Sequence, residues 1–140
     1  AAIAAIKDAV TIPVIANGDI VDSVTAQRAL DLSGANGVMI GRGAQGKPWI
    51  LAEVAHALHG TAAPAIPQGT ALVDMVIAHY EDMLSFYGSE LGARVSRKHL
   101  GWYMDGAGTP ASLRRDVLTA KDPNTVLSLL PAALQESAAA

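Results

Sequence analysis

The sequence has 140 residues, of which 51% are hydrophobic, and a formal net charge of −3 at pH 7. This length allows one domain with a hydrophobic core or two small ones. The acidic balance excludes a general basic field for nucleic acid, so such binding would need a local patch. The absence of cysteine excludes disulfides and thiolate ligands or nucleophiles, and fits a reducing cytoplasm. No apolar run approaches the roughly 20 residues of a membrane span.

The first residues have the pattern of a helix end. Residues 1–8, Ala-Ala-Ile-Ala-Ala-Ile-Lys-Asp, contain neither Met nor the basic segment of a secretory signal. They are typical of the last helical turns before a strand. We therefore expect this chain to be a piece of a longer protein.

Two strand–loop–helix units are predicted in residues 1–60. In chain order they comprise a strand at 12–16, a helix from an N-cap at Asp22 to Gly34, a strand at 38–40, and a helix over 48–59 that begins at Pro48 and is followed by Gly60. The short apolar runs are typical of strands buried on both faces. No hairpin fits between them, so the strands should be parallel. Because two units cannot cover both faces of such a sheet, a larger α/β domain is expected.

The remaining residues are predicted to form a linker and a helical domain. Residues 61–69 belong to a Pro/Gly-rich stretch without charge, which indicates a linker. Four helices are then expected, over 70–87, over 90–104, from Thr109-Pro110 to 119, and from Asp122-Pro123 onward. The apolar face of the first is Leu72, Met75, Val76, His79, Met83 and Phe86. The apolar stripe of the last is Val126, Leu127, Leu130 and Leu134. Pro131 should kink or split the last helix. Short loops between four helices favour an antiparallel bundle over 70–140, with frayed residues 137–140.

Both strand ends deliver glycine turns, which indicate an anion site. Asn17-Gly18-Asp19 follows the first strand, and Gly41-Arg42-Gly43 follows the second. Glycine lets a backbone approach a ligand closely, and Arg42 offers charge-assisted bonds to a phosphate. In a (β/α)8 barrel, the loops after strands seven and eight commonly hold phosphate groups. The alternative is that these are ordinary βα turns with a solvated Arg42.

Residues 41–46 also have the spacing G-x-G-x-x-G, but two nucleotide-binding readings fail. A dinucleotide-binding unit needs an acidic residue about 20 positions later, and none occurs between Val54 and Val73. A P-loop needs Ser or Thr after its Lys, whereas Lys47 is followed by Pro48. His56, His59 and His79 have no metal-ligand spacing, so no metal site is predicted.

The stretch 94–103 combines cations with aromatic residues on a predicted helix. Helical spacing places Arg94, Arg97, Lys98 and Gly101 on one face and Val95, His99 and Trp102 on the neighbouring face. This pattern suits RNA, because cations contact phosphates while rings stack on exposed bases. Arg114 and Arg115 could extend the patch. The alternative is an ordinary solvated helix face with Trp102 in the core.

Four stretches together resemble the C-terminal part of bacterial tRNA-dihydrouridine synthases, in particular the B-type, nitrogen-regulation-related branch. They are Ile15-Ala-Asn-Gly-Asp-Ile20, the run from Gly34 to Ile50 with Gly-Arg-Gly-Ala-Gln-Gly-Lys-Pro-Trp-Ile, Phe86-Tyr-Gly88, and Arg97-Lys-His-Leu-Gly-Trp-Tyr103. The first loop is generic to phosphate-binding barrels. The second and fourth strings are much more specific, and the resemblance covers nearly the whole chain.

The resemblance implies an FMN-holding (β/α)8 barrel followed by a helical domain that binds tRNA. Such enzymes reduce a tRNA uridine to 5,6-dihydrouridine, with NADPH reducing the flavin. By position, FMN-phosphate contacts fall on Asn17, Gly18, Asp19, Gly41 and Arg42, and RNA contacts on Arg94, Arg97, Lys98 and His99. The family's general acid is a cysteine on an earlier barrel loop that nothing here matches. No catalytic residue is therefore assigned, and the chain alone is expected to be inactive and to bind flavin weakly.

The expected architecture is α/β plus all-α: the last two βα units of a TIM (β/α)8 barrel in residues 1–60, a linker at 61–69 and a helical tRNA-binding domain at 70–140. Two other functions remain open. One is a helical RNA-binding or adaptor module without catalysis. The other is a different FMN- or phosphate-binding barrel enzyme that uses its helices to dimerise.

Overall fold

The computed structural model describes residues 2–135, so the predicted fraying of residues 137–140 lies outside the described part. The chain divides into two compact units, residues 1–65 and 66–140. The first contains helices and a small parallel sheet, and the second contains helices alone among its described residues. The predicted class, α/β followed by all-α, is confirmed at this level.

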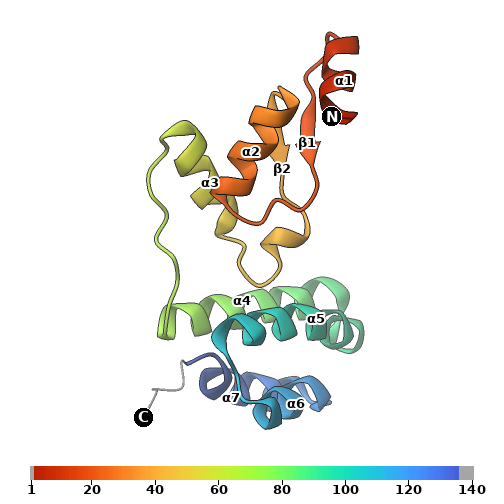
Figure 1. Cartoon of the computed structure of the whole chain (residues 1–140). Helices are drawn as coiled ribbons and strands as arrows, with labels where there is room; N and C mark the ends of the chain where they lie inside the picture. Colours follow the sequence, from red (N-terminus) through yellow and green to blue (C-terminus); the bar gives the residue numbers. More distant parts are fainter. Residues whose placement is uncertain (1, 136–140) are drawn as a thin grey trace. The chain divides into compact units, whose positions relative to one another are not determined.

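The first unit alternates helices and strands, as predicted. In chain order its elements are α1 (Ala2–Ala9), β1 (Ile15–Asn17), α2 (Ser23–Ser33), β2 (Gly37–Met39), the short 3-10 helix η1 (Arg42–Ala44) and α3 (Ile50–His59). The strands are parallel, with Ala16 paired to Val38, and α2 forms the crossover between them (Figure 1). Because parallel strands end at the same edge, the loops after β1 and β2 come together.

The ends of α2 follow from its sequence. The Asp22 carboxylate accepts from the Thr25 N–H at 2.7 Å, and the Thr25 hydroxyl accepts from the Asp22 N–H at 3.1 Å. This reciprocal capping box satisfies two donors that a helix start leaves free. Gly34 ends the helix with φ +63°, a left-handed conformation that glycine adopts without a steric penalty. The predicted boundaries of this helix are confirmed.

The prediction for the second helix of this unit was wrong at its start. Pro48 lies in a turn, and α3 begins only at Ile50. The residues before it form tight turns, in which the Lys47 N–H donates to the Ala44 carbonyl at 3.2 Å and the Ile50 N–H donates to the Lys47 carbonyl at 3.1 Å. The residues predicted to form the first helical turn are therefore part of these hydrogen-bonded turns.

Burial of the strands on both faces is also not found within this unit. In β1 only Ala16 is buried, whereas Ile15 and Met39 are exposed. The core, formed by Ile20, Ala26, Ile50 and Val54 with Val38 and Ile40 packed against it, lies on one side of the strands. Among the described residues the sheet has two strands, and the core helices α2 and α3 cover one of its faces. No described element of this unit covers the other face.

The described residues of the second unit form the four predicted helices, α4 (Thr70–Tyr87), α5 (Ser89–Ala107), α6 (Ala111–Thr119) and α7 (Pro123–Leu134). Helices α4 and α5 lie side by side, α7 packs against both, and α6 packs against α5 and α7 (Figure 1). Asp122 caps α7 by accepting from the Thr125 N–H at 3.0 Å, and Pro123 occupies the first turn as predicted.

Three details of these helices differ from the prediction. The buried side of α4 is Val73, Val76, Tyr80 and Met83, and Phe86 is exposed, because the buried stripe of the helix ends one turn earlier. Pro131 lies inside α7 without splitting it, since the last turn is held by the buried side chains of Ala133 and Leu134. Thr109 does not cap α6, because its hydroxyl donates to the Ala133 carbonyl instead.

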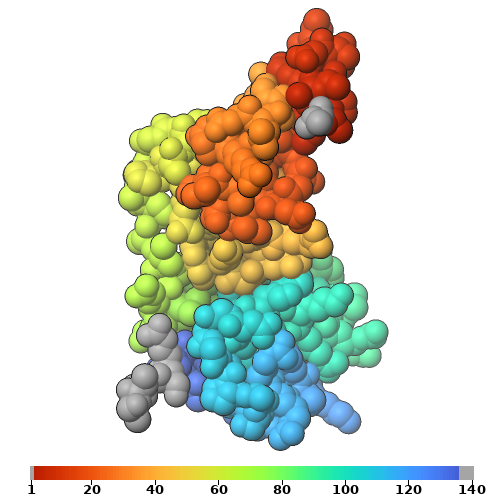
Figure 2. Space-filling view, in the orientation of Figure 1, coloured from red at the N-terminus to blue at the C-terminus, as the bar shows by residue number. Residues whose placement is uncertain are grey.

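The segment between α3 and α4 has no regular structure. Residues 61–63, 65 and 66 are exposed, and the segment is visible at the surface in the yellow-green part of the colour scale (Figure 2). Its composition gives it few apolar side chains to bury and two prolines that cannot donate backbone hydrogen bonds. No helix among the described residues is long and apolar enough to cross a membrane.

Candidate functional site

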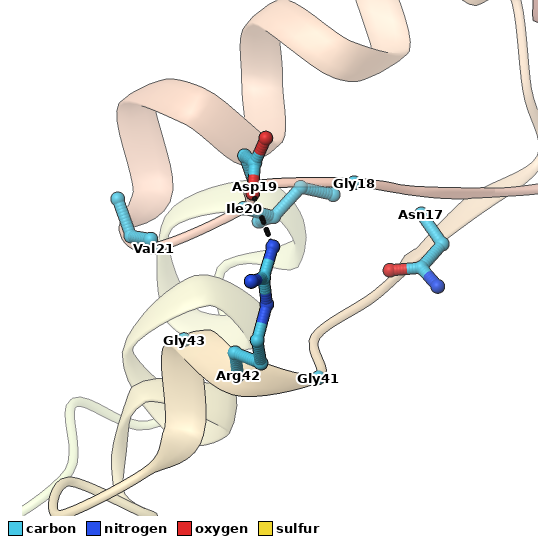
Figure 3. Close-up of a pocket in the computed structure, with 8 residues that line it drawn as sticks. All are labelled: Asn17, Gly18, Asp19, Ile20, Val21, Gly41, Arg42 and Gly43. Atoms are coloured by element: carbon cyan, nitrogen blue, oxygen red, sulfur yellow. Dashed lines mark hydrogen bonds and ion pairs between the residues drawn. The ribbon is translucent and has the colours of Figure 1, made fainter.

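The loops after β1 and β2 line one hollow of about 530 Å³. Its lining includes all five residues predicted for the phosphate site, Asn17, Gly18, Asp19, Gly41 and Arg42, together with Ile20, Val21 and Gly43 (Figure 3). Residues that lie more than 20 positions apart in the sequence thus meet because the two parallel strands end side by side. The structure brings the five together; what they bind remains a prediction.

Two glycines leave space in this hollow. A Cβ atom added to Gly18 or Gly41 would meet no other atom within 4 Å, so a side chain there would project into open space. Gly18 has φ +135°, a conformation that side chains rarely allow. An anion can therefore approach the main chain at both positions more closely than other residues would permit.

Arg42 supplies the positive charge of the hollow. Its guanidinium points toward Asp19, and the Nη2–Oδ1 distance is 3.0 Å (Figure 3). The two side chains are 84% and 88% exposed. An ion pair in such an environment contributes about 0–1 kcal/mol, because water screens it. The contact is therefore weak enough for Arg42 to exchange the carboxylate for another anion.

The two loops are fastened to one another behind this hollow. A Cβ atom on Gly43 would overlap the Ile20 carbonyl oxygen, so the backbones touch at a place where only glycine fits. The Lys47 ammonium donates to the Val21 carbonyl at 3.0 Å. The pKa of Asp22 is lowered chiefly by the Thr25 N–H that it accepts, and the positive charge of Lys47 contributes as well. These contacts fix the spacing of the loops.

The second predicted site is the exposed side of α5. Arg94, Arg97 and Lys98 are exposed, as the helical spacing indicated. Within residues 2–135, the ion pairs that form involve other cations and leave these three available. We call these three residues the basic ridge. Such an arrangement favours a polyanion, because no internal carboxylate must be displaced.

The neighbours of the basic ridge differ from the prediction. Gly101 is buried, because the Arg114 guanidinium from α6 covers it, with Nη2 3.1 Å from the position of a Cβ. Arg114 is paired with Asp105 at 2.8 Å and does not extend the ridge as a free cation. Arg115 lies 3.9 Å from Asp116. The missing side chain of Gly101 creates the notch into which Arg114 fits.

His99 is half-buried and belongs to a ring cluster between α4 and α5. Its ring is edge-to-face with His79, at a centroid distance of 5.3 Å, and with Trp102 at 5.1 Å. Nδ1 of His79 lies 3.1 Å from the Tyr103 hydroxyl. Burial lowers the pKa of His99, and the neighbouring His79 lowers it further. His99 is therefore set apart from the exposed cations with which it was predicted to act.

Residues 1–139 match the model of one protein family, described as dihydrouridine synthase (Dus). The chain belongs to the dihydrouridine synthase family. It is 55% identical over 139 residues to a probable tRNA-dihydrouridine synthase of Rhodobacter capsulatus, covering 99% of this chain and 42% of that protein. It is 47% identical over 130 residues to tRNA-dihydrouridine synthase B of Xanthomonas campestris pv. campestris, covering 92% of this chain and 39% of the relative. The resemblance to this family and to its B-type members is confirmed.

The chain spans about two fifths of the length of these relatives. Its residues contain no cysteine, and the described residues hold no group of three side chains suited to a metal ion.

The sequence patterns did not predict two features of this structure. Lys47 was considered only as a P-loop residue, although its position after the tight turn at Gly46 (φ +73°) allows it to reach back to the first loop. Phe86 was placed in the core because it continues the spacing of the α4 apolar face. No local signal separates a final apolar residue that is buried from one that is exposed.

Proposed function

We propose that this chain forms part of a flavin-dependent tRNA-dihydrouridine synthase, which reduces a tRNA uridine to 5,6-dihydrouridine with NADPH as reductant. The observation that supports this most strongly is the family match along the chain, in which the motif residues of the two loops line one hollow. The first unit then supplies contacts to the FMN phosphate, and the second supplies the tRNA-docking face. The protein would act in the cytoplasm.

The loop residues fit the phosphate group of a flavin nucleotide. Asn17, Gly18, Asp19, Gly41 and Arg42 would hold it, the glycines through their unobstructed backbone and Arg42 through its guanidinium. The flavin supplies the hydride when bound. In this proposal the flavin ring, the general acid and the other substrate contacts lie in parts of the protein outside these residues, so this chain alone should neither bind FMN tightly nor turn over.

The architecture that goes with this function is also a proposal. Residues 1–60 would be the last two βα units of a (β/α)8 barrel, residues 61–69 the linker, and residues 70–140 a helical tRNA-binding domain. The exposed face of the two-stranded sheet supports this assignment, because a barrel would cover strands that are bare here. Family membership favours the synthase over a helical adaptor or a different flavin enzyme.

The docking role rests on the basic ridge. Its three cations are exposed and lie within two helical turns of each other on α5. Binding of tRNA by cations releases counterions from the nucleic acid, so affinity must fall steeply with salt. A ridge that is merely solvated would not produce this dependence.

Titration of bulk tRNA into the chain over about 50 to 200 mM salt tests this proposal, with fluorescence anisotropy as the measurement. We expect the logarithm of affinity to fall linearly with the logarithm of salt, and Arg97→Ala to reduce the slope by about one. Lys121→Ala, which changes an exposed lysine of the same unit away from the ridge, is the control and should leave the slope unaltered. Absence of tRNA binding at low salt would contradict the docking role.

A further inference from the structure

The turn between α4 and α5 exposes an aromatic pair that the proposed function does not use. Phe86 is 82% exposed and Tyr87 is 46% exposed. Their rings meet edge-to-face, with centroids 4.8 Å apart and planes at 82°. A large apolar ring on the surface is informative when it stands with a second ring and not alone. Core packing does not account for this pair.

The turn that carries the two rings is held in place by its backbone. Helix α4 ends at Tyr87 and α5 begins at Ser89, with Gly88 at φ +79° as the single residue between them. At Gly92 the helices touch so closely that a Cβ would lie 2.7 Å from the Met83 carbonyl oxygen. The Gly92 N–H also donates to the Gly88 carbonyl at 2.8 Å. A ligand on this turn would therefore meet preformed geometry, which reduces the entropy that binding must overcome.

The two rings lie next to the basic ridge and to two carboxylates. Tyr87, Leu91 and Arg94 line one hollow of about 470 Å³, which also includes Glu90. A second hollow beside it is lined by Phe86, Tyr87 and Asp82, among others. Arg94 is the first cation of the basic ridge, so the aromatic pair and the ridge form one continuous surface of the second unit.

The combination of aromatic rings, a guanidinium and carboxylates favours a particular kind of ligand. Aromatic faces and a guanidinium stack on nucleobases. The carboxylates of Asp82 and Glu90 repel a phosphate at the rings but accept hydrogen bonds from the exocyclic amino groups of cytosine, adenine and guanine. Uracil has a carbonyl at the position where cytosine carries its amino group. The rings therefore suit a base, and the ridge next to them suits its backbone.

We propose that Phe86 and Tyr87 form a stacking site for an unpaired base of the bound RNA, with a preference for a base that carries an exocyclic amino group. This inference rests on the proposed tRNA docking and specifies the kind of nucleotide that docks. The base lies over the ring pair, its amino group donates to Glu90, and the adjoining phosphates follow Arg94 and the rest of the ridge. A double-stranded segment cannot bind in this way, because its bases are already stacked and paired.

Binding of short single-stranded oligocytidylate and oligouridylate to the 140-residue chain, measured by fluorescence anisotropy beside bulk tRNA, tests the site. We expect the cytidine oligomer to bind more tightly than the uridine oligomer. Phe86→Leu should weaken binding of tRNA and of oligocytidylate about 5- to 150-fold, the range for loss of one stacked base, without altering the salt slope. Phe86→Trp should restore binding. Glu90→Ala should abolish the preference for cytidine.

The control is Val24→Ala, which removes an exposed apolar side chain from the first unit and should leave all affinities unchanged. If tRNA binds the chain but Phe86→Leu binds as tightly as the unchanged protein, the stacking site is excluded and the docking role of the ridge stands. Equal affinity for the two oligomers excludes the role of Glu90 and the base preference. Lower thermal stability of Phe86→Leu with unchanged RNA affinity shows that the rings serve protein packing, and also overturns the proposal.

Discussion

Gly41 and Gly43 are two residues apart in one loop, and the absence of a side chain has a different consequence at each position. At Gly43 a Cβ would overlap the Ile20 carbonyl oxygen, a backbone atom that cannot rotate away. At Gly41 a Cβ would meet nothing within 4 Å and would occupy the hollow. One glycine is thus needed for folding of the loop pair, and the other leaves room for a ligand.

We predict that Gly43→Ala destabilises the first unit by about 1 to 3 kcal/mol, the usual cost of forcing atoms into an occupied space. Gly41→Ala is the matched variant and should change stability by no more than about 0.5 kcal/mol, as for most surface substitutions. Urea unfolding followed through Trp49, in a Trp102→Phe background, provides the measurement. Equal stabilities of the two variants would show that the loops separate without cost.

In the full-length protein, Gly41→Ala should have the larger effect on flavin content, although Gly43→Ala has the larger effect on stability. Gly41→Ala places a methyl group where the flavin phosphate is proposed to lie, so we expect the purified protein to contain less flavin although it remains folded. A Gly41→Ala protein with a full complement of flavin would show that the phosphate lies elsewhere.

These loops also show how far sequence reasoning extends at the residue scale. The glycine turns and Arg42 were recognisable because their chemistry is local: a backbone without side chains and a guanidinium. The ion pair between Arg42 and Asp19, and the bond from Lys47 to the Val21 carbonyl, depend on how two distant segments meet. Local sequence patterns do not show which distant segments lie close together. The two contacts follow from the parallel pairing of β1 and β2.

At the scale of elements, α5 divides its residues between solvent and the ring cluster against α4. Arg94, Arg97 and Lys98 face solvent, whereas His99 packs edge-to-face against His79 and Trp102. Burial lowers the pKa of His99, which means that the folded protein favours the neutral imidazole. The stabilising contribution of the neutral ring is complete above the unfolded pKa, about 6.5, and is lost as the pH falls through that value toward the folded pKa.

We predict a titration of His99 with a midpoint below about pH 6.5. Because the rings of His99 and Trp102 are 5.1 Å apart, Trp102 fluorescence in a Trp49→Phe background should decrease as the imidazole gains its proton. The second unit should become less stable over the same pH interval. His99→Gln should remove the fluorescence step, whereas His59→Gln, on α3, should retain it. A midpoint at or above the ordinary value would contradict the role of burial.

Helix positions in the second unit were predictable because their ends carry strong signals. Asp122-Pro123 and the glycines after α4 and α5 mark boundaries through capping and backbone conformation, which act within a few residues. The buried face of α4 was predicted less well. Phe86 fits the helical spacing as well as Met83 does, and only the position of α5 decides that Met83 is covered and Phe86 is not.

At the scale of the whole molecule, the two units differ in how completely they bury their apolar residues. The second unit surrounds Tyr80, Met104 and Leu130 with four helices, and all three are at most 1% exposed. The first unit leaves Ile12, Ile15 and Met39 exposed on and beside its two strands. Such strands gain little from the hydrophobic effect on that face, so this unit should open more readily than the other.

We predict that limited proteolysis with elastase, which cleaves after small residues, first cuts the chain within residues 61–69. The alanines there are accessible and the segment lacks regular structure, whereas the alanines of α5 and α7 lie within packed helices. Mass spectrometry should identify a helical fragment that persists and a residue 1–60 fragment that is degraded soon afterwards. Initial cleavage within residues 61–69 would also support the proposed domain boundary, because a protease separates two domains at the segment between them. Initial cleavage inside α4 or α5, or equal survival of both fragments, would contradict it.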